Sequence, residues 1–150
     1  MRKLAKAALK LLIISTVLKF IGTAVSRAFE GECTASDDDF KLMALMDGRE
    51  LASEATSLRT GTAFAAMGGI DIDLRRATLD PGGAHIALKA YMGGIRLIVP
   101  EQWKVYVDQE LCAGGIDVRT PPTDTLGNDA PRLTVEAIAC AGGILIGTEE

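Results

Sequence analysis

The chain has few residues of the types that usually carry chemistry. Its 150 residues include a single histidine, His85, and three cysteines, Cys33, Cys112 and Cys140, which lie far apart in the sequence. It contains no nucleophile elbow, phosphate-binding loop, dinucleotide fingerprint or Cys-x-x-Cys pair. The sequence therefore predicts no catalytic residue, no cofactor and no metal ion.

Basic and aromatic residues are scarce as well. The 16 lysines and arginines are outnumbered by 20 acidic residues, so the net charge is -4, and aromatic residues make up only 5%. A general nucleic-acid-binding protein would present a basic face, and this composition argues against one. Hydrophobic residues account for 48% and glycine for 16 positions. We therefore expect an aliphatic core and a chain that bends often, in one compact domain with at most a short appendage.

Residues 1–28 differ in composition from the rest of the chain. Four basic residues stand in the first ten positions, and the segment Ala7–Val25 is apolar apart from Lys10 and Lys19. Neither proline nor glycine occurs before position 22. The segment therefore predicts one long helix, close to the length of about 20 residues that spans a bilayer.

Three interpretations of this helix stay open. It is a membrane anchor that spans or lies in the interface, a secretory signal peptide, or a soluble helix that covers the open end of the following domain. If it spans, the basic residues before it place the amino end in the cytoplasm and the remaining chain outside. Residues 29–39 are rich in acidic side chains and predict a polar linker.

From Phe40 onward the chain repeats itself, which is the strongest structural signal it contains. The repeated phrase is a Gly-Gly pair followed by an aliphatic residue, a variable residue and a second aliphatic residue. Full copies begin near residues 65, 90, 111 and 139, and a weaker copy begins near residue 44. The second glycines are separated by 21, 25, 21 and 28 residues. A globular fold without internal repeats would not ordinarily produce such a pattern.

Each copy predicts two short strands joined by a corner. A corner needs positive φ or a backbone without Cβ, and we assign this role to Gly48, Gly68, Gly69, Gly93, Gly94, Gly114, Gly115, Gly142 and Gly143. The first aliphatic residue after each full pair predicts an inward core column of Ile70, Ile95, Ile116 and Ile144. One copy is too small to bury its own apolar face. Residues 40–147 therefore predict an all-β solenoid of about five stacked rungs.

The variable residues between the aliphatic ones predict the outer face. If consecutive copies stack in register, Asp71, Arg96 and Asp117 lie on successive rungs about 4.8 Å apart. Opposite charges then become neighbours. We expect a charge ladder of alternating sign on the outside of the solenoid.

The repeated Gly-Gly-Ile phrase, together with the segment Ile98–Val105 that contains Pro100, Glu101 and Trp103, resembles the carboxy-terminal domain of LiaF-like, cell-wall-active-antibiotics-response proteins. This domain is also called the toastrack domain. The resemblance implies a single-stranded right-handed parallel β-helix. It also implies a role in bacterial envelope-stress signalling through protein contacts at the membrane, without catalytic residues.

We therefore expect a non-enzymatic interaction and assembly module of a bacterial envelope-stress response. Its partner would be another protein or a second copy of the chain, and residues 1–28 would attach it to the membrane. The alternative is a parallel β-helix enzyme or an adhesin that acts on extracellular polysaccharide. That alternative requires several charged side chains to converge on one outer face.

Five polar or thiol side chains are candidates for chemistry. His85 has no second histidine beside it in the sequence and is expected at the surface. Asp71 and Asp73 project from the same face of one strand, as a pair of catalytic carboxylates would, although Arg96 is the expected neighbour of Asp71. Cys112 and Cys140 are expected on adjacent rungs, where packing is the simplest role and a disulfide stays open.

Overall fold

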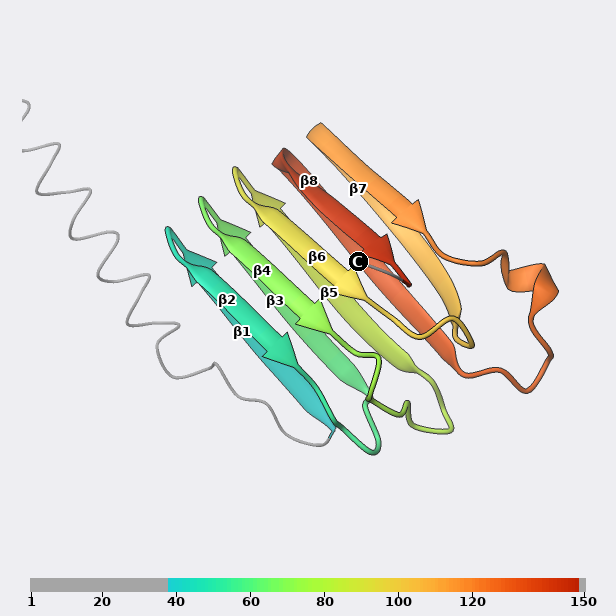
Figure 1. The fold of residues 1–150 in the computed structure, drawn as a ribbon. Coiled ribbons are helices and arrows are strands. Elements are labelled where there is room, and N and C mark those ends of the chain that lie inside the picture. Colours follow the sequence, from blue (N-terminus) through green and yellow to red (C-terminus); the bar gives the residue numbers. More distant parts are fainter. Residues whose placement is uncertain (1–37, 149–150) are drawn as a thin grey trace, which may run out of the picture. The chain divides into compact units, whose positions relative to one another are not determined.

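The computed structural model describes residues 38–148, which form an all-β domain (Figure 1). The all-β prediction is confirmed for this part of the chain. The strands are β1 (Asp39–Leu45), β2 (Gly48–Ala52), β3 (Thr60–Ala66), β4 (Gly69–Asp73), β5 (Ala84–Tyr91), β6 (Gly94–Ile98), β7 (Lys104–Arg119) and β8 (Arg132–Gly147), with one 3-10 turn, η1 (Thr123–Thr125).

The predicted helix of residues 1–28 lies outside the described residues, as does nearly all of the predicted linker. Within residues 38–148, no helix has the length and hydrophobicity that crossing a membrane requires.

The strands pair in parallel and form two layers that face each other (Figure 1). One layer contains β1, β3 and β5, and the other contains β2, β4 and β6. The glycines that follow each corner pair with one another, Gly48 with Gly69 and Gly69 with Gly94. The repeated phrases thus lie in register, because any slip by one residue would turn the aliphatic residues outward.

The two 16-residue strands β7 and β8 run through both layers. The first half of β8 pairs with β5 and its second half pairs with β6, so the strand bends at Gly142 and Gly143. β7 follows β8 along its whole length, with a register shift between Leu111 and Gly114. Each long strand therefore contributes one complete turn of the two-layer stack.

The order of the last two copies differs from the sequence prediction. Gly94 pairs with Gly143 of the fourth full copy, and Gly143 pairs with Gly115 of the third. The expectation that consecutive copies lie directly on one another is therefore wrong at this point. A loop, residues 120–131, carries the chain back so that β8 enters between β7 and the preceding strands.

The inward residues explain this exchange. In β8 the inward positions are Leu133, Val135, Ala137 and Ala139, all with no more than 1% of their surface exposed. In β7 the residue opposite Ala137 is the polar Gln109, which is exposed. A strand with a polar inward residue is tolerated at the end of the stack and not in its interior.

The core lies between the two layers and is aliphatic. Ile70, Ile95 and Ile144 are no more than 3% exposed, and the residue two positions after each is buried as well. The turns that close the third side of the stack add further buried residues: Ala55, Leu58, Leu74, Ala77, Leu79, Val99 and Trp103. The segment Ile98–Val105, which contains Trp103, thus contributes buried side chains to the core.

The first glycine of each full pair is required by the close approach of the backbones. A Cβ atom on Gly93 would overlap the carbonyl oxygen of Gly68 on the neighbouring strand, and one on Gly142 would overlap that of Gly93. The second glycine is different, because a Cβ atom on Gly69 or Gly115 would meet nothing within 4 Å. Only one glycine of each pair is therefore forced by packing.

Candidate interaction surface

Methionines occupy the corner of the first three copies and form an exposed row. Met46, Met67 and Met92 have φ values of 56° to 58°, in the left-handed region that residues with a Cβ atom rarely adopt. Their backbone N–H groups donate to the neighbouring strand, as from Met46 to the carbonyl of Ala66 at 3.0 Å. The side chains are 78%, 56% and 64% exposed, respectively. The row therefore presents flexible apolar groups to solvent at a conformational cost of order 1 kcal/mol each.

The corner was predicted to need glycines with positive φ or without a Cβ atom; the first glycine of each full pair meets the second requirement, but the positive φ of the methionines was not predicted. Among the first glycines of the pairs, only Gly114 has positive φ, at 109°. Ala141 takes the methionine position in the fourth full copy, with a φ of 56°. The sequence signal for this conformation was that methionine recurs at the same place in three copies, two residues before the second glycine.

An apolar strip lies beside the methionine row on the outer face of the β1, β3 and β5 layer. Ala66 pairs with Leu45 on one side and with Tyr91 on the other, so these three side chains share one outward column. The rings of Phe64 and Tyr91 lie 5.4 Å apart between centroids. Tyr91 is 38% exposed. The strip and the methionine row together make an apolar edge of the domain.

The β7 end of the stack leaves part of the core column uncovered. Val107, Ile116 and Val118 point along the inward columns but are only half-buried, and Leu111 is 55% exposed. β7 pairs with β8 and, among the described residues, with no other strand. Both the apolar groups and one backbone edge of β7 are therefore available at this end.

The predicted charge ladder is only partly formed. Asp71 pairs with Arg96, and the Arg96 Nε atom lies 3.6 Å from the Asp71 carboxylate. Leu145 of β8 stands between Arg96 and Asp117, so the third member of the predicted ladder is wrong. Asp117 instead forms an ion pair of 2.7 Å with Arg119 on its own strand. The exchange of the last two copies is the physical reason.

A shallow groove of about 550 Å³ runs beside this ladder on the outer face of the β4 and β6 layer. Its floor is formed where the second glycines lack side chains, and Asp71, Arg96, Asp117 and Leu145 line it. The groove is thus a direct result of the glycines that packing does not require.

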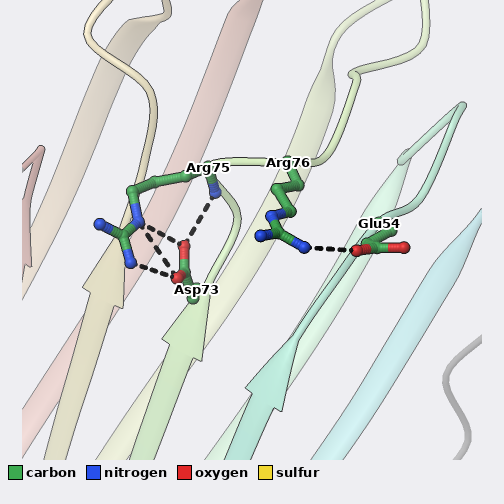
Figure 2. Close-up of polar contacts among 4 residues, drawn as sticks. All are labelled: Glu54, Asp73, Arg75 and Arg76. Atoms are coloured by element: carbon green, nitrogen blue, oxygen red, sulfur yellow. Dashed lines mark hydrogen bonds and ion pairs between the residues drawn. The ribbon is translucent and has the colours of Figure 1, made fainter.

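The Asp73 carboxylate is held by Arg75 (Figure 2), whereas Asp71 pairs with Arg96, so the two aspartates are not a pair of free carboxylates. Arg75 donates to the Asp73 carboxylate from its backbone N–H at 3.0 Å, from Nε at 3.0 Å and from Nη2 at 2.7 Å. Hydrogen bonding to the Arg75 side chain holds the pKa of Asp73 below its usual range. Beside it, Arg76 donates to Glu54 at 2.9 Å. The contact between Arg76 and Glu54 joins two neighbouring turns, whereas Asp73 and Arg75 belong to one turn.

Asp80 has a similar structural role in the turn before β5. Its carboxylate accepts hydrogen bonds from the Gly82 backbone at 3.0 Å, from the Ser57 hydroxyl at 3.0 Å and from the Arg59 Nε atom at 3.2 Å. The bond from Gly82 is the largest cause that lowers the pKa of this carboxyl group. His85 is exposed nearby in sequence, and its Nε2 atom lies 3.8 Å from the Glu136 carboxylate.

The cysteine positions predicted to be adjacent are joined by a disulfide. The Cα atoms of Cys112 and Cys140 are 4.8 Å apart, and their Sγ atoms are bonded. The packing role that the sequence favoured is therefore replaced by a covalent link between β7 and β8 at the register shift. Groups of three or more His, Cys, Asp or Glu side chains able to hold a metal ion do not occur within residues 38–148.

Comparison with known proteins gives one match. The model of the protein family described as cell wall-active antibiotics response LiaF, C-terminal, matches residues 47–137. The matched segment contains the corners of four copies, the Trp103 segment and the beginning of β8, up to Ala137. No curated protein and no solved structure matches the chain.

Proposed function

The chain belongs to the LiaF-like C-terminal family of cell wall-active antibiotics response proteins, and from this premise we propose that it is a non-enzymatic interaction and assembly module. The family places it in the response to antibiotics that act on the cell wall. In our proposal it transmits that response through contacts with a protein partner at the bacterial cell membrane, and residues 1–28 attach it there.

The observation that carries the proposal is the uncovered β7 end. Apolar side chains that are buried in the rest of the stack are half-buried or exposed in β7, as Ile116 and Leu111 are. Beside them runs a strand edge with unpaired backbone groups, which is a template for pairing with another chain. Asp73, one of the carboxylates considered as a catalytic group, is instead held in an ion pair by Arg75. The arrangement therefore favours binding over catalysis.

The disulfide supports a location outside the cytoplasm. Such bonds persist in oxidising compartments and are rare where glutathione keeps thiols reduced. The Cys112–Cys140 bond thus agrees with the topology in which the amino end is cytoplasmic and residues 40–147 lie on the outer side.

We further propose a right-handed β-solenoid of about five rungs over residues 40–147, joined to residues 1–28 by the linker 29–39. The support is that the five second glycines, Gly48, Gly69, Gly94, Gly143 and Gly115, form one continuous row of pairs. In this architecture every rung repeats the same corner and the same inward column.

The functional proposal is tested by complementation. In a strain that lacks the gene, an envelope-stress reporter is measured after exposure to a cell-wall antibiotic, with wild-type protein, Leu111→Lys or Thr62→Lys supplied. Leu111 lies at the β7 end, whereas Thr62 is an exposed residue of the interior strand β3. We expect Leu111→Lys to change the response severalfold and Thr62→Lys to leave it unchanged. Equal responses for wild type and Leu111→Lys would contradict the proposed role of this end.

Attachment is tested separately by fractionation. The intact chain and a chain without residues 1–28 are compared after a carbonate wash of membranes. We expect only the intact chain to stay in the membrane pellet. Release of both proteins would remove the anchor from the proposal.

A further inference from the structure

We infer that the β7 end binds a second copy of this chain and forms a closed dimer; this inference rests on the proposed interaction function and specifies its partner. The two ends of the stack differ in the charge that they present to a second copy. One end is β7, and the other is formed by β1 and β2.

The inward column of β7 lacks two of the features by which edge strands ordinarily avoid pairing. The strand contains no proline over its 16 residues. None of its inward residues after Val105 is charged, since they are Val107, Gln109, Leu111, Ile116 and Val118. Natural edge strands are often protected by prolines or by inward-pointing charges. Neither of these two features therefore prevents another strand from pairing with β7, and the register shift is confined to the corner between Leu111 and Gly114.

The β2 end carries the protection that β7 lacks. Arg49 pairs with Ile70 and so occupies the last position of the isoleucine column. It is exposed, and its guanidinium lies 3.9 Å from the Asp47 carboxylate. A second stack placed on this end would bury that charge against an apolar column, which is unfavourable without a partner.

This asymmetry decides the kind of assembly. Head-to-tail stacking of β7 on β2 would extend into a filament, but it requires Arg49 to be buried. Pairing of β7 with a second β7 uses the same uncharged inward column on both copies, and such a two-fold contact closes after two subunits. The second copy also supplies an edge of matching length and an apolar column in the matching place. We therefore assign β7 to a symmetric contact.

The size of the end predicts a weak dimer. Half of β7 is about 8 residues, or about 26 Å at about 3.3 Å per residue, and two layers about 10 Å apart with their side chains are about 20 Å across. The face is thus about 500 Å² per copy. About 1,000 Å² in total is near the lower limit of specific interfaces. Two copies held on one membrane would meet at a high effective concentration, which compensates for weak affinity.

The test is sedimentation equilibrium of the purified full-length chain in detergent, over about 1 to 200 μM protein. Wild type is expected to show a concentration-dependent dimer. Leu111→Lys and, separately, Gln109→Lys place a charge on the open end and are expected to weaken dimerisation at least tenfold. Thr62→Lys is the matched control, because it also adds a lysine to an exposed position but lies on the interior strand β3. It is expected to dimerise as wild type does.

Arg49→Leu tests the other end. Removing the charge is expected to permit head-to-tail stacking, so that species larger than a dimer appear and grow with concentration. Thermal unfolding of every variant shows that the fold is retained, and Gln109→Lys serves if Leu111→Lys fails to fold.

The inference is overturned if wild type stays monomeric at 200 μM, or if neither lysine at the β7 end weakens the dimer. A monomer whose Leu111→Lys variant still alters the stress response would mean that a different protein uses this end. In that result the proposed function stands and the self-association fails. The reverse result, an intact dimer with no effect on the response, would count against the function alone.

Discussion

β7 and β8 have equal length, share the Gly-Gly corner and pair with each other along both layers, yet their environments differ. β8 has a strand on each side and buries its inward residues, whereas β7 ends the stack and leaves them half-buried or exposed. Among the inward positions of their first halves, a single polar residue, Gln109 in place of Ala137, marks the difference between them. The comparison shows that a repeat fixes the shape of each unit, while small departures from it fix the unit's position.

The largest expected effect separates the two strands directly. Ile144 of β8 and Ile116 of β7 pair in the same column, but only Ile144 is fully buried. We expect Ile144→Ala to lower the free energy of unfolding by about 3 kcal/mol and Ile116→Ala by about 1 kcal/mol, because a cavity forms only where the site is enclosed. Urea denaturation of both variants measures the difference. Equal losses would show that the β7 end is covered in solution.

The second-largest expected effect concerns the corner glycines, which β7 and β8 share. Gly142 of β8 and Gly114 of β7 each lie against a neighbouring carbonyl oxygen, so Ala at either position is expected to cost about 2 kcal/mol or more. A Cβ atom on Gly115 would meet nothing within 4 Å, and one on Gly143 would lie at an ordinary contact distance of 3.9 Å from a carbonyl oxygen, so Ala at either position is expected to change stability by less than about 0.5 kcal/mol. Thermal unfolding of the four variants checks this. A cost at Gly115 as large as at Gly114 would contradict the assigned roles of the pair.

A smaller effect depends on pH and concerns β4, an interior strand. The pKa of Asp73 is lowered in the folded chain, chiefly by its hydrogen bond from Arg75, so the ionised group stabilises the fold above its unfolded pKa of about 3.9. This contribution is lost as pH falls through the folded pKa. We expect Asp73→Asn to reduce the loss of stability between pH 7 and pH 3, measured by urea midpoints. Asp108→Asn on β7 is the control for removing one carboxylate, and an identical change in both variants would refute the role of Arg75.

The smallest effect concerns the charged outer face. Asp71 and Arg96 are about half exposed, so their ion pair is expected to contribute a few tenths of a kcal/mol. A double-mutant cycle with Asp71→Ala and Arg96→Ala measures this coupling. The same cycle with Arg96 and Asp117 should give none, because Leu145 separates them. Coupling between Arg96 and Asp117 would restore the order of copies that the sequence suggested.

Much of the architecture follows from local pattern. The alternation after each Gly-Gly pair predicts which aliphatic residues turn inward, and Ile70 and Ile95 are buried neighbours as that alternation requires. The order of the last two copies could not be predicted in this way, because equivalent phrases give no information on which neighbour each one takes. Gln109 indicates that β7 belongs at the end of the stack, but this inference requires knowing that residue 109 points inward.

The interaction surface was harder to predict than the core. Whether a side chain such as Leu111 is covered depends on which strand lies at the end, and this is a property of the whole stack. The left-handed conformation of Met46, Met67 and Met92 was missed for a related reason. Local preference assigns that conformation to glycine, but the approach of neighbouring backbones already fixes the first glycine of the pair.

The exchanged order of the last copies has a consequence for biosynthesis. The ribosome makes β7 before β8, yet β8 is the strand on which β7 rests. A nascent chain that has emerged only as far as residue 131 therefore lacks the strand with which β7 pairs in the complete domain. The carboxy-terminal segment that arrives last must enter the middle of the row, so the domain is completed by insertion and a premature stop there would leave two open edges.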